Sequence, residues 1–185
     1  MQLQAPVAAF LLLALPGAAV AASTVYGQGP GHLCYEGARS GRADARALAD
    51  CDEALGSAAQ LSQRDTAATL VNRGVIRLQR RDAPAALADF DRAIQVRPSL
   101  GEAHVNRGAA LILRGDFAGA VVAIDRGLEL GAADPHEAYF NRAIAWEQLD
   151  NLPQAYADYR KAQALAPDWP LPAQELARFT VTGAR

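Results

Sequence analysis

The tetrapeptide VNRG occurs at residues 71–74 and again at 105–108, and the related FNRA occupies residues 140–143. The asparagines of the three copies are 34 and then 35 residues apart. The agreement continues past each tetrapeptide, with a small residue two positions after the asparagine, an alanine fourteen after it and a bulky residue eighteen after it. A constant period in this range is typical of proteins built from repeated supersecondary units.

Each copy contains two helical patterns separated by a turn. In the second copy Val121, Ile124 and Leu128 follow one another at three- and four-residue steps, which places them on one stripe of a helix. The stretch RGDF at 114–117 precedes that helix and supplies turn residues. We therefore expect two antiparallel helices per copy. A single hairpin cannot bury its apolar face alone, so neighbouring hairpins are expected to stack into an all-α solenoid.

The repeated positions resemble the tetratricopeptide repeat. The resemblance rests on the small residue after each asparagine, the two alanines, the bulky residue between them and the closing prolines at Pro98 and Pro167, and it spans residues 67–169. Leu70 and His104 stand where the family often has an aromatic residue, and Ala132 replaces the middle copy's proline. The repeats are therefore diverged. We expect helices near 32–40, 43–58, 66–80, 84–96, 101–114, 117–130, 136–149 and 152–165, followed by a short capping helix near 171–179.

The first 35 residues contain no charged side chain. An apolar run from Val7 to Leu15 is followed by Pro16, Gly17 and an A-x-A cleavage pattern at 19–21, which is typical of a secretory signal peptide. The run is too short to span a bilayer, and no membrane insertion of the mature chain is expected. The segment before the run lacks lysine and arginine, so an apolar tail on a cytosolic protein remains the alternative. We predict export, to the periplasm or the medium.

A degenerate repeat precedes the three clear ones. The stretch ALADCDEAL at 47–55 nearly repeats ALADFDRAI at 86–94, so Cys51 takes the place of Phe90. The family resemblance then places Cys34 on the first helix of this hairpin, facing Cys51. Two facing cysteines in an exported chain suggest a disulfide. A zinc site with His32 and a thiol nucleophile are weaker interpretations, because the spacing matches no familiar zinc site and His32 lies at a helix end. The expected division is a signal peptide (1–21), a flexible lead-in (22–31), the degenerate repeat (32–66), three repeats (67–100, 101–135 and 136–169) and a capping helix with tail (170–185).

The composition argues against several classes of function. A formal net charge of −2 shows none of the basic excess that nucleic-acid binding requires. Lys161 is the only lysine, and we interpret the many arginines as composition bias and solvated helix faces. No Ser-His-Asp or paired-carboxylate constellation can be assembled from the sequence. We therefore predict a protein that is not an enzyme and that has no cofactor and no metal site.

The resemblance implies a concave groove lined by the first helix of each repeat, in which family members hold an extended peptide or a partner's helix. The groove positions lie one before, three after and six after each asparagine, and they form an apolar floor with little charge. An asparagine column beside that floor can bond a peptide backbone; the alternative is that the amides only bond neighbouring hairpins. The candidate ligand-binding residues are Asn72, Asn106, Asn141, Val71, Val75, Leu78, Val105, Ile112, Phe140 and Ile144.

Two further possibilities concern what the groove holds. Members of the family that grip a carboxylate carry lysine or arginine four residues before such asparagines, whereas this chain has Ala68, Glu102 and Glu137 there. An acidic peptide terminus is therefore not expected as the ligand. The leading prediction is a protein or peptide partner bound to a non-catalytic scaffold. The alternative is a self-associating protein whose groove is filled by its own tail or by a second copy.

Overall fold

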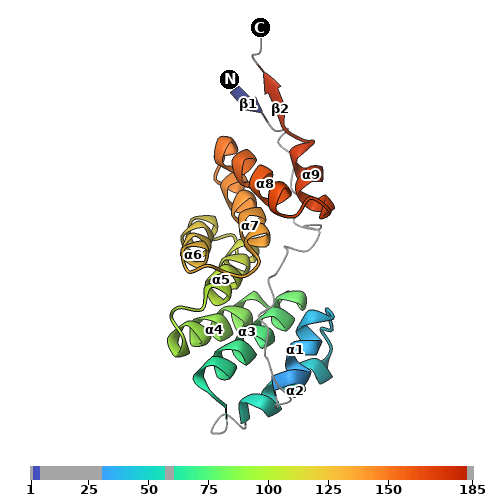
Figure 1. The fold of residues 1–185 in the computed structure, drawn as a ribbon, viewed down its shortest axis with the longest axis vertical. Coiled ribbons are helices and arrows are strands. Elements are labelled where there is room, and N and C mark those ends of the chain that lie inside the picture. Colours follow the sequence, from blue (N-terminus) through green and yellow to red (C-terminus); the bar gives the residue numbers. More distant parts are fainter. Residues whose placement is uncertain (1, 5–30, 57–60, 183–185) are drawn as a thin grey trace.

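A computed structural model describes residues 2–4, 31–56 and 61–182, and these residues form a solenoid of helical hairpins (Figure 1). The predicted all-α solenoid is confirmed. The helices begin and end within three residues of the expected limits throughout the described part of the chain. They are α1 Gly31–Arg39, α2 Ala45–Gly56, α3 Gln63–Gln79, α4 Ala83–Val96, α5 Gly101–Leu113, α6 Phe117–Glu129, α7 Pro135–Gln148, α8 Leu152–Leu165 and α9 Pro170–Leu176.

Side-chain caps explain where several helices start. The hydroxyl of Ser62 accepts a hydrogen bond from the backbone N–H of Asp65 at 3.1 Å, so α3 begins earlier than the expected residue 66. Asp82 and Asp116 cap α4 and α6 in the same way. Each cap satisfies one of the backbone donors that have no partner in the first turn of a helix.

The repeated small and bulky residues pack against each other inside each hairpin. A Cβ atom added to Gly74 would lie 2.4 Å from a ring carbon of Phe90, and one added to Gly108 would lie 2.4 Å from Ile124. All of these bulky side chains are fully buried. The small residue therefore allows the two helices of a hairpin to approach until the bulky side chain fills the space between them.

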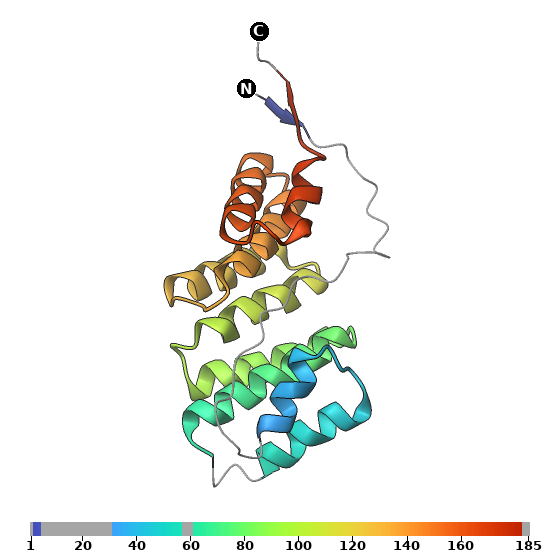
Figure 2. The ribbon, with the colours of Figure 1, turned by 45° about the vertical axis from the view of Figure 1, so that its right-hand side comes forward.

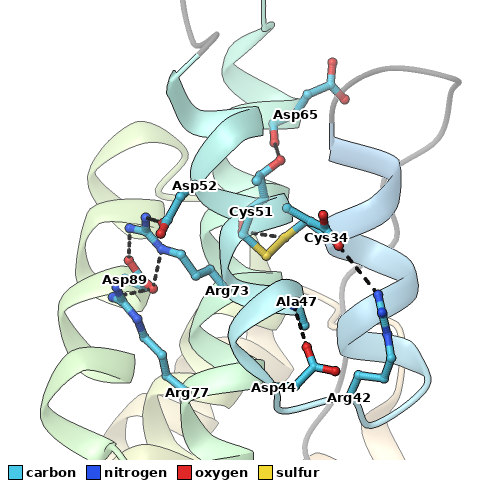
Figure 3. The surroundings of a disulfide bond; sticks show 12 residues. Cys34, Arg42, Asp44, Ala47, Cys51, Asp52, Asp65, Arg73, Arg77 and Asp89 are labelled. Carbon is cyan, nitrogen blue, oxygen red and sulfur yellow. Dashed lines mark hydrogen bonds and ion pairs between the residues drawn. A yellow bond between two sulfur atoms is a disulfide. The ribbon is translucent and has the colours of Figure 1, made fainter.

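The first hairpin, α1 and α2, packs on α3 and carries the two cysteines. A disulfide joins Cys34 on α1 to Cys51 on α2, with a Cα–Cα distance of 4.5 Å (Figure 3). Both residues are fully buried in the apolar core. The disulfide thus takes the position that Phe90 occupies in the following hairpin.

The two ends of the solenoid differ. The capping helix α9 covers α8, where Phe179 contacts Tyr156 and Tyr159 at ring-centroid distances of 5.6 and 6.0 Å. Beyond it, strand β1 (Gln2–Gln4) pairs antiparallel with β2 (Thr180–Thr182), with Leu3 opposite Val181. The sequence did not predict this pair. Helix α1 lies at the opposite end of the solenoid (Figures 1 and 2).

The predicted signal peptide and lead-in fall mostly outside the described residues. Residues 2–4 of the signal peptide form β1, and Gly31 of the lead-in begins α1. Cleavage, export and the division of the chain into segments stay predictions.

Candidate functional site

The three repeated asparagines lie in the middle of α3, α5 and α7, the first helices of successive hairpins. These helices are neighbours in a row, because α3 contacts α5 and α5 contacts α7. Asn72, Asn106 and Asn141 are each 0% exposed to solvent. The repeat therefore brings three equivalent amides into one row of the interior.

The apolar groove residues are also buried. None of the ten candidate residues is more than 8% exposed, so the structure does not show the open groove floor that the sequence analysis expects. The seven apolar members belong to one apolar core that runs continuously through the hairpins. Their apolar chemistry is as expected, and contact with a ligand stays a prediction. The seven are Val71, Val75, Leu78, Val105, Ile112, Phe140 and Ile144.

Asn72 has an unusual environment. Its side-chain Nδ2 and Oδ1 atoms are both buried, and neither forms a hydrogen bond. Leaving a buried polar group without a partner costs about 1–3 kcal/mol, so such groups are rare in native proteins. An amide in this state is complementary to a peptide backbone, which offers both an N–H donor and a C=O acceptor.

Two glutamates lie four residues before the second and third asparagines. The carboxylate of Glu102 accepts a hydrogen bond from the backbone N–H of Ala133 at 3.1 Å. The Oε2 atom of Glu137 is buried and has no hydrogen-bond partner. Desolvation, with a smaller contribution from nearby Asp134, raises the pKa of Glu137 to about 7. This end of the row therefore carries a carboxyl group that titrates near neutral pH.

The C-terminal tail of the chain contacts the last of the predicted groove positions. Glu147, six residues after Asn141, accepts hydrogen bonds from the Tyr159 hydroxyl at 3.1 Å and from Arg178 at 2.8 Å. Arg178 follows α9, which packs on α8. Residues 170–179 therefore cover the last hairpin. Arg178 brings this part of the tail onto one predicted groove position, and the alternative that the tail or a second copy fills the groove stays a prediction.

The similarity of this chain to known proteins is found by comparing folds and not by comparing sequences. No family model matches the sequence, and no curated protein matches it. Among solved structures, the first TPR domain of human RPAP3 superposes with a TM-score of 0.58 at 22% identity, covering 61% of this chain and 88% of that one. The chain has the tetratricopeptide repeat (TPR) fold.

Two other TPR structures extend the comparison. The first TPR of Spaghetti (RPAP3), bound to the HSP90 peptide SRMEEVD, gives a TM-score of 0.58 at 21% identity and covers 64% of this chain and 92% of its own. MamA from Desulfovibrio magneticus RS-1 gives a TM-score of 0.62 at 20% identity and covers 80% of this chain and 79% of its own. The three likenesses therefore cover between 61% and 80% of this chain.

Arginines one residue after each asparagine join neighbouring hairpins of the TPR array. Arg73 on α3 pairs with Asp89 of its own hairpin and with Asp52 of the hairpin before it (Figure 3). Arg142 repeats this arrangement with Asp158 and Asp125. We call each such group an Arg–Asp clip.

The sequence interpretation of these arginines as solvated side chains was wrong. The side chains of Arg73 and Arg142 are 14% and 21% exposed, and those of Asp89 and Asp158 are 3% and 7% exposed. A signal was present in the sequence, because both aspartates stand seventeen residues after their asparagines. The residue at the same offset in the middle TPR is Ala123. Only two of the three copies therefore carry the aspartate, which makes the repeated Arg–Asp spacing difficult to recognise in the sequence.

The middle TPR consequently has a weaker clip. Arg107 pairs with Asp91 of the preceding hairpin at 2.7 Å, and the two side chains are 36% and 50% exposed. The ion pair at this joint is therefore more exposed to solvent than the pairs of Arg73 with Asp89 and of Arg142 with Asp158.

The described part of the TPR array contains no group of three or more His, Cys, Asp or Glu side chains placed to hold a metal ion. Within the same described residues, no helix has the length and apolar character needed to cross a membrane. A polar pocket of about 260 Å³ lies between the start of α5 and the end of α6, and its lining includes Arg64, Arg97 and Ser99.

Proposed function

We propose that this protein is a non-catalytic protein-binding module whose row of first helices, α3, α5 and α7, holds an extended peptide or a partner's helix. The observation that carries the proposal is the buried amide of Asn72, which has no partner for either polar atom. It sits among large apolar side chains and has equivalents in the next two repeats. A ligand backbone that bonds this amide removes the cost of leaving it unpaired.

The chemistry of the row favours an apolar, charge-poor ligand. The candidate residues include no lysine or arginine, and the acidic side chains beside them are Glu102, Glu137 and Glu147, of which Glu147 is paired with Arg178. The HSP90 peptide bound by Spaghetti, SRMEEVD, carries three acidic residues. A peptide of that kind would be repelled here, because like charges in a partly desolvated site are unfavourable. We therefore propose a ligand with aliphatic or aromatic side chains and an exposed backbone.

We further propose that the protein acts outside the cytoplasm. The charge-free N-terminal sequence with its apolar run supports export. The Cys34–Cys51 pairing supports an oxidising compartment, since structural disulfides persist there and are rare in the cytosol. Intact mass of the protein recovered from the cell envelope of a bacterial host tests this. Export predicts a chain beginning near Ala22 or Ser23, whereas a soluble cytosolic protein retaining Met1–Ala21 would refute it.

Peptide selection tests the binding function. The envelope-recovered protein is used to select from a displayed library of random peptides, and the enriched peptides are measured by fluorescence anisotropy. We expect apolar, charge-poor sequences, and we expect Asn72→Ala to weaken binding because it removes the amide that would bond the ligand backbone. Val122→Ala is the control, since Val122 is 70% exposed and lies outside the row. Equal loss in both variants, or enrichment of acidic peptides, would contradict the proposal.

A further inference from the structure

The polar pocket between the start of α5 and the end of α6 is small and is built from several elements. Its volume is about 260 Å³, and its walls come from the start of α3, the α4–α5 turn, the first turn of α5 and the residues after α6. Pockets that hold drug-sized molecules have volumes of roughly 300–1,000 Å³. The pocket therefore suits a smaller ligand.

Arg97 lines this pocket and has no acidic partner. Six arginines in the described part of the chain are half-buried. Five of them form ion pairs with aspartate or glutamate, and these are Arg73, Arg77, Arg107, Arg142 and Arg178. The side chain of Arg97 forms neither an ion pair nor a hydrogen bond with another described residue. A cation that is partly removed from water is unfavourable without a counter-charge, so Arg97 is suited to an anionic ligand.

Glu102 lines the same pocket but does not supply that counter-charge. Its carboxylate accepts the backbone N–H of Ala133 at 3.1 Å and forms no ion pair with Arg97. A second guanidinium, that of Arg64, also belongs to the lining. The described lining therefore carries two positive side chains and one negative side chain.

Further hydrogen-bond donors surround the pocket. Ser99 contributes a hydroxyl group from the α4–α5 turn. The first turn of α5 contributes backbone N–H groups, because its N-cap residue, Leu100, makes no side-chain cap. Together with the two guanidinium groups, these donors come from separate elements around one small cavity. Such an arrangement suits a ligand whose acceptor atoms point in several directions.

We propose that this pocket binds a tetrahedral oxyanion, namely inorganic phosphate or the phosphate group of a small ester. A phosphate presents oxygens on several sides, and the planar fork of an arginine can bond two of them at once. The ligand supplies the counter-charge that Arg97 lacks. The site uses none of the three asparagines, so it is separate from the proposed peptide-binding row of α3, α5 and α7.

Isothermal titration calorimetry of the full chain with sodium phosphate, at constant ionic strength, tests the proposal. Arg97→Gln removes the guanidinium that lacks a partner. Arg92→Gln is the matched control, because Arg92 is exposed on α4 and lies outside the pocket. We expect Arg97→Gln to bind phosphate at least about tenfold more weakly than the unmodified chain, the effect of losing a charged hydrogen bond. The control should bind phosphate as the unmodified chain does.

A second variant keeps the test valid if Arg97→Gln is poorly folded. Arg97→Lys retains the charge and loses the planar fork, so its affinity for phosphate should lie between those of the unmodified chain and Arg97→Gln. Circular dichroism establishes that each variant is folded. Absence of phosphate binding by the unmodified chain would overturn the proposal. Equal weakening in Arg97→Gln and Arg92→Gln would also overturn it, because the attraction would then be a general effect of charge.

Two further measurements identify the source of the phosphate and separate this site from the peptide-binding row. Vesicles of phosphatidylcholine, with and without phosphatidic acid, are sedimented with the full chain. Binding to the acidic vesicles without binding of free phosphate would show a lipid headgroup site and would overturn the small ligand. Asn72→Ala should bind phosphate as the unmodified chain does. Loss of phosphate binding in that variant would contradict the separation of the two sites.

Discussion

Arg142 and Arg107 occupy the same position in successive repeats and differ in what they contact, which allows a matched test of the Arg–Asp clip. Arg142 donates from Nε and Nη2 to the two carboxylate oxygens of Asp158, at 2.7 and 2.8 Å. These hydrogen bonds hold the pKa of Arg142 above its ordinary value. Arg107 instead makes one bond to Asp91, which is half exposed.

Replacing each arginine with methionine removes the charge and keeps most of the apolar stem. Arg142→Met leaves Asp158, whose side chain is 7% exposed, without its bidentate partner. Breaking a buried pair costs about 3–5 kcal/mol, and the partial exposure of Arg142 favours the lower end, about 3 kcal/mol. Arg107→Met breaks an exposed pair and should cost about 0–1 kcal/mol.

Urea unfolding followed by far-ultraviolet circular dichroism measures both values. The free energy of unfolding should fall about 2 kcal/mol or more further for Arg142→Met than for Arg107→Met. Arg142→Met is also expected to broaden the transition, because the stability of stacked repeats is a sum of repeat and interface contributions. Equal losses in the two variants would refute the claim that burial of the clip sets its contribution.

Three further predictions address other parts of the fold. Cys51→Ala opens a loop whose ends are 17 residues apart, so it should lower the free energy of unfolding by about 3 kcal/mol in the chain-entropy model. The helical content of this variant should be retained. Free alkylation of both thiols in the native exported protein would show that the disulfide does not exist. The folded-state pKa of Glu137 is raised to about 7 from an ordinary 4.5, so folding takes up a proton between these values. The free energy of unfolding should therefore fall, by up to about 3 kcal/mol, as pH rises through that range, and Glu137→Gln should abolish this slope in a pH series of urea titrations. Gly108→Ala should lower the melting temperature because its Cβ would lie 2.4 Å from Cγ1 of Ile124. Ile124→Ala removes that atom, so it should cost less stability in the Gly108→Ala background than in the unmodified protein, and equal costs in the two backgrounds would contradict the packing argument.

The sequence was sufficient for the fold because the positions that determine it recur. Gly74 with Phe90 and Gly108 with Ile124 show the same small and bulky pairing at the same offset, so the hairpin could be deduced from their spacing. The degenerate first hairpin was recognisable for the same reason, since residues 47–55 keep six of the nine residues at 86–94 and differ only at Cys51, Glu53 and Leu55.

Other features depend on contacts that no local pattern encodes. The β1–β2 pair joins residues 2–4 to residues 180–182, and three-residue strands have no periodicity to detect. Asn72 is buried because other parts of the fold cover the row of first helices. The residue type at this position does not by itself indicate that burial. The clip at Arg142 joins three helices, and its equivalent is incomplete in the middle repeat because Ala123 replaces the aspartate.

The affinity of Asn72→Ala for a selected peptide, measured beside its free energy of unfolding, tests the central claim most directly. If the amide bonds a ligand backbone, binding should weaken by about 1–2 kcal/mol, the value of one or two lost hydrogen bonds. Stability should not fall by more than about 1 kcal/mol, because removing an amide whose two polar atoms are buried without a partner relieves a cost that offsets the small cavity left by alanine. Unchanged affinity with a clear loss of stability would show that the asparagine supports the fold, and it would contradict the proposed peptide-binding row.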